Sequence, residues 1–219
     1  MKNYFYLRKI NQELANENNL LLNQLDYYKQ LVANNPAESA DAQPGRKYTY
    51  IPARVINNSI NKQYNYISIN KGSHHGVQPE MAVISSNGVV GVVLAVSGNF
   101  STIISLLNRD FRISAKIKKN NYYGSLSWKG TDHYTAELSE IPYHVDVQVG
   151  DTIVTSGYSA IFPEGILLGV ISSYNIEESN FYQIEVELSV DYKNLVNVNV
   201  IRNLLRDEQT DLEKTETND

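Results

Sequence analysis

A short pattern of apolar and turn-forming residues occurs twice in this chain, and it constrains the fold more than any other feature. The first copy is Val77–Ser86, and the second is Val147–Ser156, 70 residues later. A glycine-bounded turn and an apolar run follow each copy, Gly88–Leu94 in the first and Gly165–Ile171 in the second. The repeat predicts two related lobes. Chance similarity within a valine-rich β protein is the alternative.

Short runs of β-branched and aromatic residues dominate the chain after Pro52. Tyr66–Ile69 and Phe181–Leu188 are examples, and such runs are bounded by Gly, Pro, Asn and Ser, as strands usually are. No long helical period follows Pro52. Because alternating βα units would need amphipathic helices between the strands, the pattern favours small sandwiches or barrels. We therefore expect a mainly β body.

The first 33 residues carry a heptad pattern that predicts a coiled-coil helix. Leucine at position d favours two-stranded coiled coils, and a buried asparagine at position a pairs best with the same residue of a parallel partner. We therefore predict parallel homodimerisation through this helix. The alternative is a helix that packs on its own β body, since further apolar residues widen the stripe. The seam residues are Leu7, Leu14, Leu21 and Tyr28 at d and Asn11, Asn18, Leu25 and Val32 at a.

Composition divides the rest of the chain. Residues 34–52 contain Asn-Pro and Pro-Gly pairs, which favour turns, so we expect a linker. We expect residues 53–115 to form the first lobe and residues 116–203 the second. In the alternative, the strand near 195–203 belongs to the first lobe. Residues 204–219 are acidic and poor in large apolar side chains, so we expect a disordered tail.

Charge and apolar content exclude several functional classes. The net charge is −5 and the acidic tail accounts for most of it, so the body has no basic face for nucleic acid. No apolar run approaches the about 18 to 20 residues of a membrane-spanning helix, so we expect the chain as given to be soluble. The absence of cysteine excludes disulfides and thiolate metal sites.

Five segments together resemble the MreC family of rod shape-determining proteins. Each one alone is a common hairpin pattern, but their joint order behind a coiled coil is specific. Two departures are Glu80, where the family usually has glycine, and Leu167, where it usually has proline. The segments are Ile69–Ile84 (INKGSHHGVQPEMAVI), Gly88–Val93 (GVVGVV), Gly124–Leu126 (GSL), Val149–Gly157 (VGDTIVTSG) and Phe162–Gly169 (FPEGILLG).

The resemblance implies a non-catalytic scaffold of the bacterial elongation complex. It implies two small six-stranded β-barrel lobes behind the coiled coil, and a single-pass inner-membrane protein with this part in the periplasm. Family members begin with a membrane helix that this sequence lacks, so we expect an exported fragment whose Met1 is not the natural start. The implied partners are MreD, the MreB-associated complex, the elongation-specific penicillin-binding protein and its glycosyltransferase. No cofactor or metal is implied.

Two other functions are alternatives. The paired lobes are similar to those of chymotrypsin-like peptidases, but neither Ser156 nor Ser159 lies in a nucleophile motif. A glycan-binding β module is the second alternative, with Tyr122, Tyr123 and Trp128 as stacking platforms or, otherwise, as strand-packing residues. The further peptidase candidates are His74, His75, His133, His144, Asp110 and Asp151. The histidines are dispersed, so we expect no metal site.

One apolar pair lies where a surface loop is expected. Ile161 and Phe162 fall in a connection between strands, and such connections normally lie at the surface. We therefore predict a partner-binding site there. In the alternative, the pair tucks into the end of the barrel as a plug.

Overall fold

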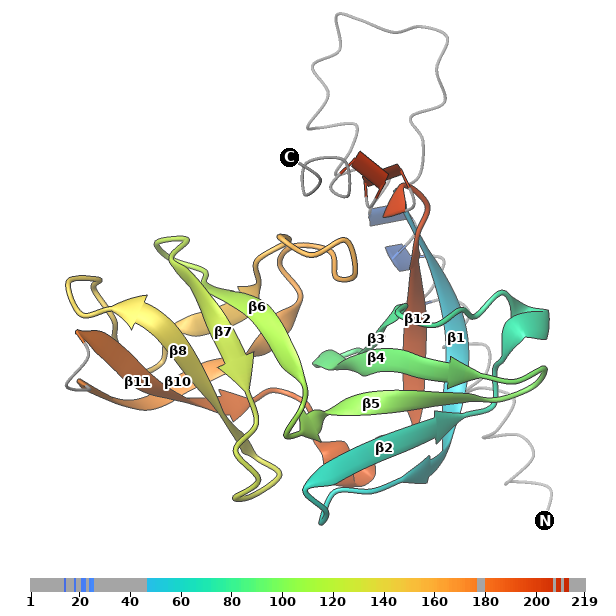
Figure 1. The fold of residues 1–219 in the computed structure, drawn as a ribbon, viewed down its shortest axis with the longest axis horizontal. Helices are drawn as coiled ribbons and strands as arrows, with labels where there is room; N and C mark the ends of the chain where they lie inside the picture. Colours follow the sequence, from blue (N-terminus) through green and yellow to red (C-terminus); the bar gives the residue numbers. More distant parts are fainter. Residues whose placement is uncertain are drawn as a thin grey trace, which may run out of the picture.

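Two closed six-stranded barrels make up the computed structural model (Figure 1). The structure describes residues 14, 18, 21, 22, 24, 25, 47–176, 180–206, 208, 209, 211 and 212. The expected mainly β body with two six-stranded barrels is confirmed. Within the described residues, no helix is both long enough and apolar enough to cross a membrane.

Both barrels are antiparallel, and their strands are short. The first contains β1 (Tyr48–Asn58), β2 (Tyr64–Ile69), β3 (Ala82–Ser85), β4 (Gly88–Val96), β5 (Ser101–Asn108) and β12 (Asn197–Asn203). The second contains β6 (Arg112–Ile117), β7 (Tyr123–Ser127), β8 (Thr135–Pro142), β9 (Thr152–Thr155), β10 (Leu167–Ile176) and β11 (Phe181–Leu188). Two short 3₁₀ helices, η1 (Ser73–His75) and η2 (Tyr192–Asn194), lie in the connections.

Alternation along the strands fills both barrels with apolar side chains. In β6, Ile113, Ala115 and Ile117 are buried while the residues between them are at least partly exposed. In β2, Ile67 and Ile69 point inward in the same way. Because successive side chains of a strand point to opposite faces, these positions line the interior. The barrels are therefore packed cores rather than channels.

The sequence repeat corresponds to a structural repeat. Val83 of β3 lies opposite Gly91 of β4, and Ile153 of β9 lies opposite Gly169 of β10. A side chain at either glycine would overlap a carbonyl oxygen of the next strand, that of Ile104 or Glu187. Glycine is required at both positions for this close backbone approach. The predicted relationship between the two lobes is thus seen in equivalent strands.

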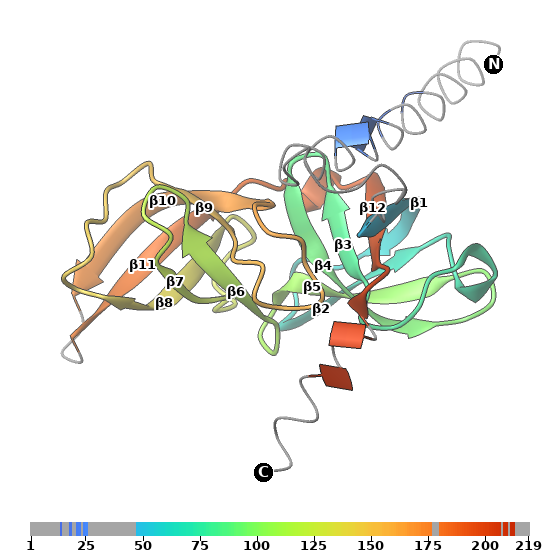
Figure 2. The same cartoon turned by 90° about the horizontal axis from the view of Figure 1, so that it is seen from above.

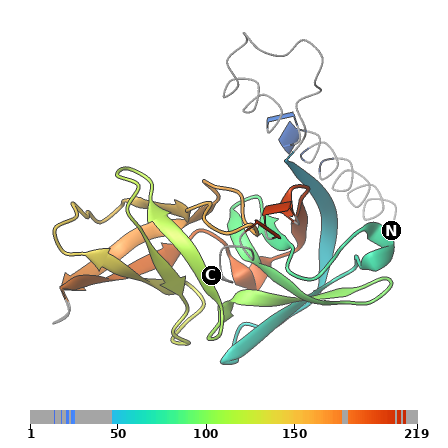
Figure 3. The ribbon, with the colours of Figure 1, turned by 45° about the horizontal axis from the view of Figure 1, so that its top comes forward.

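The two repeats exchange their sixth strands. In the first barrel β12 lies between β1 and β3, and in the second barrel β6 lies at the equivalent place between β7 and β9. Each of these strands follows the five strands of one repeat but completes the barrel of the other. The strand expected near 195–203 is β12, and it belongs to the first barrel, which is one of the two predicted alternatives. It runs beside β1 (Figure 3).

The exchange moves the boundary between the lobes. The first barrel's β5 ends at Asn108 and the second barrel's β6 begins at Arg112, so the connection is 109–111 rather than the expected 115/116. The reason is that β6 pairs with β7 and β9. The expected linker 34–52 is also shorter at its end, because β1 begins at Tyr48 and pairs with β12 from its first residue.

The predicted helix and tail lie mostly outside the described residues. Leu14, Asn18, Leu21 and Leu25 have helical backbone, but they define no continuous helix, and the coiled coil stays a prediction. The other four seam residues are not described. In the expected tail, residues 206, 208, 209, 211 and 212 have helical backbone, so the predicted disorder is not seen at them. For 213–219 it stays a prediction.

Candidate interaction surfaces

The apolar pair predicted to bind a partner lies in the connection between β9 and β10. Phe162 has only 4% of its surface exposed and belongs to the apolar core. The backbone amides of Ile161 and Phe162 both donate to the Ser159 hydroxyl oxygen at 3.3 Å, which turns the chain inward. Burial therefore favours the plug alternative for Phe162, because an interface anchor must be accessible before binding.

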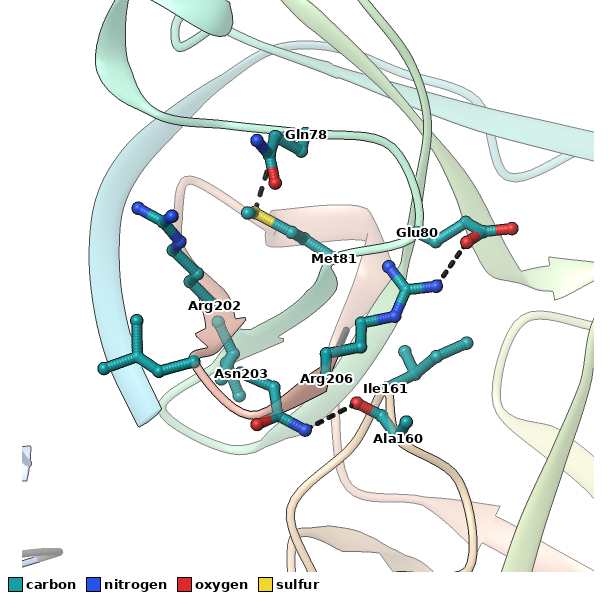
Figure 4. Close-up of a pocket in the computed structure, with 10 residues that line it drawn as sticks. Gln78, Glu80, Met81, Ala160, Ile161, Arg202, Asn203 and Arg206 are labelled. Atoms are coloured by element: carbon teal, nitrogen blue, oxygen red, sulfur yellow. Dashed lines mark hydrogen bonds and ion pairs between the residues drawn. The ribbon is translucent and has the colours of Figure 1, made fainter. Parts of the chain in front are cut away.

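Ile161 lies at the junction of the two barrels. It lines a small cavity of about 60 Å³ between them (Figure 4). This volume is far below the roughly 300 Å³ of a typical ligand pocket, so we assign the cavity to packing. The other lining residues are Gln78, Glu80, Met81, Ala160, Ile201, Arg202, Asn203, Leu204 and Arg206.

One polar contact beside this cavity joins the two barrels: the Asn203 side-chain amide donates to the Ala160 carbonyl oxygen at 2.9 Å (Figure 4). The Arg206 guanidinium pairs with the Glu80 carboxylate within the first barrel's side of the cavity. Glu80 has a φ of 64°, in the region that favours glycine. A second contact lies on the side of the first barrel that faces the second (Figure 2), where Gly88 packs against the Leu167 carbonyl.

The peptidase candidates do not converge. The Ser156 hydroxyl donates to the Ser114 hydroxyl at 2.8 Å, and Ser159 accepts from backbone amides. His75 accepts from the Gly72 amide at 3.3 Å. Among the hydrogen bonds of the described residues, none joins a serine to a histidine. The same part of the chain holds no cluster of three metal-ligating side chains.

Trp128 is not a surface platform. Its side chain is 4% exposed, and its indole N–H donates to the Asp132 carbonyl oxygen. Of the two interpretations of Trp128, strand packing therefore holds and surface stacking does not. Tyr123 is exposed and makes an edge contact with Tyr158, with ring centroids 4.9 Å apart.

A different group of aromatic residues gathers at one end of the second barrel. The connections 118–122 and 143–151 leave this end and β10 finishes there, because β6, β8 and β10 run in the same direction. It is the end that faces away from the first barrel (Figure 1). We call its aromatic residues the distal aromatic row: Tyr122, Tyr143, His144, Tyr174 and Tyr182.

The members of this row contact one another in sequence. The Tyr122 and His144 rings meet edge to face at 6.1 Å between centroids, and His144 meets Tyr143 at 6.4 Å. The Tyr182 hydroxyl donates to the Tyr143 carbonyl oxygen at 2.9 Å, and its ring meets Tyr174 at 5.4 Å. Sequence reasoning singled out Tyr122 but missed the row. Its other members come from separate connections and strands.

Comparison with known proteins assigns the fold to a family. The family model described as "Rod shape-determining protein MreC, barrel core" matches residues 55–202. The chain belongs to the MreC family. The matched range runs from β1 to β12, and thus includes the strand exchange. The MreC of Listeria monocytogenes is 30% identical over 161 residues, which are 72% of this chain and 55% of that protein.

Solved MreC structures agree with the barrels. The structure of Listeria monocytogenes MreC has a TM-score of 0.69 at 26% identity, covering 90% of this chain and 94% of that one. MreC in a complex with penicillin-binding protein PBP2 from Helicobacter pylori has a TM-score of 0.57 at 18% identity, covering 72% and 99%. The present chain spans about half the length of the curated MreC relatives that it matches.

Proposed function

We propose that this chain is a non-catalytic scaffold of the complex that elongates the bacterial cell wall. Family membership supports a role in cell shape. The observation that carries the proposal is the family member from Helicobacter pylori solved in a complex with a penicillin-binding protein. The fold fits such a role, because the two barrels are joined by side-chain contacts and exchanged strands and so present their surfaces at a fixed spacing.

The finer parts of the proposal concern location and partners. In it, the barrels lie in the periplasm, tethered to the inner membrane by a helix that precedes this sequence in the whole protein. The chain dimerises through its N-terminal helix. It brings together the elongation penicillin-binding protein, its glycosyltransferase, MreD and the MreB-associated complex.

Replacement of the chromosomal gene tests this function. The full-length protein should keep cells rod-shaped, and crosslinking through residues on both barrels should capture the elongation transpeptidase. A null strain should become round. Normal rods in the null strain, or failure of every crosslinking position to capture a peptidoglycan synthase, would contradict the scaffold role.

A matched set of variants tests the non-catalytic part. His74→Ala, His133→Ala, His144→Ala, Ser156→Ala and Ser159→Ala should each support rod shape, since the two serines bond to a hydroxyl and to backbone amides rather than to a histidine. Loss of rod shape from one such variant that stays folded and abundant would instead support a peptidase.

A further inference from the structure

β10 reaches the end of the second barrel that faces away from the first (Figure 2), and one of its edges is left without a neighbouring strand there. Its pairing with β9 stops at Val170, and the last backbone hydrogen bonds on that side join Ile171 to the residues just before β9. Its pairing with β11 continues to Ile176. Among the described residues, β10 therefore has one strand neighbour instead of two over 172–176.

The first barrel closes the equivalent edge, which belongs to β4. Val93 has the same bonds as Ile171, to the residues just before β3. Beyond it, the Ser73 amide of η1 donates to the Ser97 carbonyl oxygen at 2.9 Å, directly after β4 ends. The shorter connection 143–151 of the second barrel, which the structure describes in full, has no such helix. The edge of β10 is thus left open where its counterpart is covered.

Tyr174 and Ile176 direct backbone groups toward this open edge. Tyr174 lies opposite the buried Ile184, so its side chain belongs to the inner face of the strand. Ile176, two residues on, lies on that face, and the bulge between them keeps the buried Ile171 on it as well. Residues on one face of a strand direct their N–H and C=O groups to the same side. Those of Ile171 point to the β9 side, so those of Tyr174 and Ile176 do too.

The open edge lacks most of the features that protect strand edges in proteins. Ser172–Ile176 (SSYNI) contains no lysine, no proline and no charge. The Ile176 side chain is 67% exposed and that of Tyr174 is 38% exposed. The bulge lies at the base of the segment and leaves the rest of the edge straight. Such an edge pairs readily with an extended segment of another chain, through main-chain hydrogen bonds.

The charges near this end disfavour a second copy of the chain as the occupant, because acidic side chains outnumber basic ones. Antiparallel pairing of two copies along the edge would bring two acidic ends together, which like charge opposes. A strand with basic residues beside its paired stretch would instead be attracted. The acidic residues are Glu140, Asp146, Asp151, Glu177, Glu178 and Glu185, and the basic ones are Lys118 and Lys119, of which Lys119 already pairs with Asp146 and Asp151.

We infer that the open edge of β10 is a docking site for an extended segment of another protein, which adds a strand to the second barrel. The segment's backbone bonds to the N–H and C=O groups of Tyr174 and Ile176. Its apolar side chains lie on the inner face beside these two residues, its polar ones lie outside, and a basic residue at its end complements the carboxylates. This inference goes beyond the scaffold role, because it specifies the conformation of the bound segment and does not require a peptidoglycan synthase.

Hydrogen exchange of the whole chain, followed by NMR, tests whether the edge is open. The amides of Tyr174 and Ile176 should exchange fast, and that of Asn175, which faces β11, should exchange slowly. Slow exchange at all three would show that the edge is already covered and would overturn the inference. The probe for binding is a blocked synthetic peptide, Lys-Thr-Val-Thr-Val-Thr-Lys. At millimolar concentration it should slow exchange at Tyr174 and Ile176.

A matched peptide tests the charge preference. The acidic peptide Glu-Thr-Val-Thr-Val-Thr-Glu should bind about tenfold more weakly than the basic one, which corresponds to about 1.4 kcal/mol. On the protein, Asn175→Lys should weaken binding of the basic peptide, and Asn175→Glu should not. Equal binding of the two peptides, or unchanged exchange at Tyr174 and Ile176, would overturn the inference.

A pair of variants at one position tests the backbone contact. Ile176→Pro removes an N–H that points to the open edge and leaves the ladder with β11 intact. Ile176→Ala is the control, because it also loses the side chain but keeps the N–H. The proline variant should bind the basic peptide about fivefold more weakly than the alanine variant, as expected for one lost hydrogen bond. Equal binding by the two would mean that the edge is not the site.

Sedimentation separates a second copy from a different protein. The variant Leu14→Asn with Leu21→Asn lacks the predicted helical seam and should be monomeric. A dimer of this variant that Ile176→Pro dissociates would assign the edge to a second copy and overturn the inference. Failure of the scaffold role would appear differently, as normal rods in the null strain while the basic peptide still slows exchange at Tyr174 and Ile176.

Discussion

The Tyr192 hydroxyl donates a 2.8 Å hydrogen bond to the Val89 carbonyl oxygen, across 103 residues of sequence. Tyr192 belongs to η2, on the path that returns β12 to the first barrel, and Val89 lies in β4. The Tyr192 side chain is fully buried, and its carbonyl oxygen accepts from the Asn58 side-chain amide at 2.6 Å. The return path is therefore fixed to the first barrel by both ends of one residue.

Removing this hydroxyl should destabilise the chain. In Tyr192→Phe the Val89 carbonyl loses a buried partner, which costs about 1 to 3 kcal/mol. Chemical denaturation of the purified protein measures the change. The control is Tyr64→Phe, an exposed residue of β2, which should change the free energy of unfolding by less than about 0.5 kcal/mol. Equal effects of the two substitutions would mean that the hydrogen bond contributes nothing specific.

The same residue should make the protein sensitive to alkali. Burial raises the pKa of Tyr192 above its ordinary value of about 10. Above pH 10 the unfolded chain releases this proton while the folded chain keeps it, so its contribution to stability is complete below pH 10 and declines as pH rises. The slope is up to about 1.4 kcal/mol per pH unit. Denaturation between pH 9 and 12 should therefore show a shallower decline for Tyr192→Phe.

Phe162 should behave as a core residue. Phe162→Ala leaves a cavity in the second barrel, and such truncations cost about 3 to 5 kcal/mol. Ile161→Ala should cost less, because Ile161 is only partly buried at the junction of the barrels. Thermal melts of the two variants test the order. A Phe162→Ala protein with an unchanged melting temperature but weaker partner binding would restore the interface role predicted from the sequence.

The strand exchange predicts that one repeat cannot fold alone. A fragment of residues 47–111 contains β1 to β5 but lacks β12, so the edges of β1 and β3 are left unpaired. It should show no cooperative melting by circular dichroism. Adding a synthetic peptide of residues 195–206 should restore a cooperative transition, whereas a peptide of residues 110–119, which carries β6, should restore less. A cooperative transition in the fragment alone would show that the exchange is dispensable.

Local sequence signals predicted the repeat, the β body and the glycine positions, because each depends on residues within a few positions of one another. Only part of the strand exchange could be predicted from the sequence. The return of the strand near 195–203 to the first lobe was one of two predicted alternatives. The place of β6 was not predicted, because it depends on pairing with β7 and β9, which no local pattern encodes. The sequence left two alternatives each for Trp128 and Phe162, a buried and a surface position, for a related reason: both lie in or beside connections, and only the fold shows that these turn inward. The distal aromatic row comes from several separate segments, and only the fold brings them together.

The last prediction concerns the N-terminal helix. Leu14, Leu21 and Leu25 are each about half exposed in the single chain, so pairing of two helices would bury apolar area that the monomer leaves in water. About four heptads give a weak seam, and we expect a dimer that dissociates on dilution. Sedimentation should detect it near 100 μM, which corresponds to an association free energy of about −5.5 kcal/mol. Leu14→Asn with Leu21→Asn should abolish the dimer and leave the β signal in circular dichroism unchanged, because the barrels do not depend on the seam. Gln24→Asn, outside positions a and d, is the control and should dimerise normally. A wild-type chain that sediments as a monomer at this concentration would remove the helix as an autonomous dimerisation element.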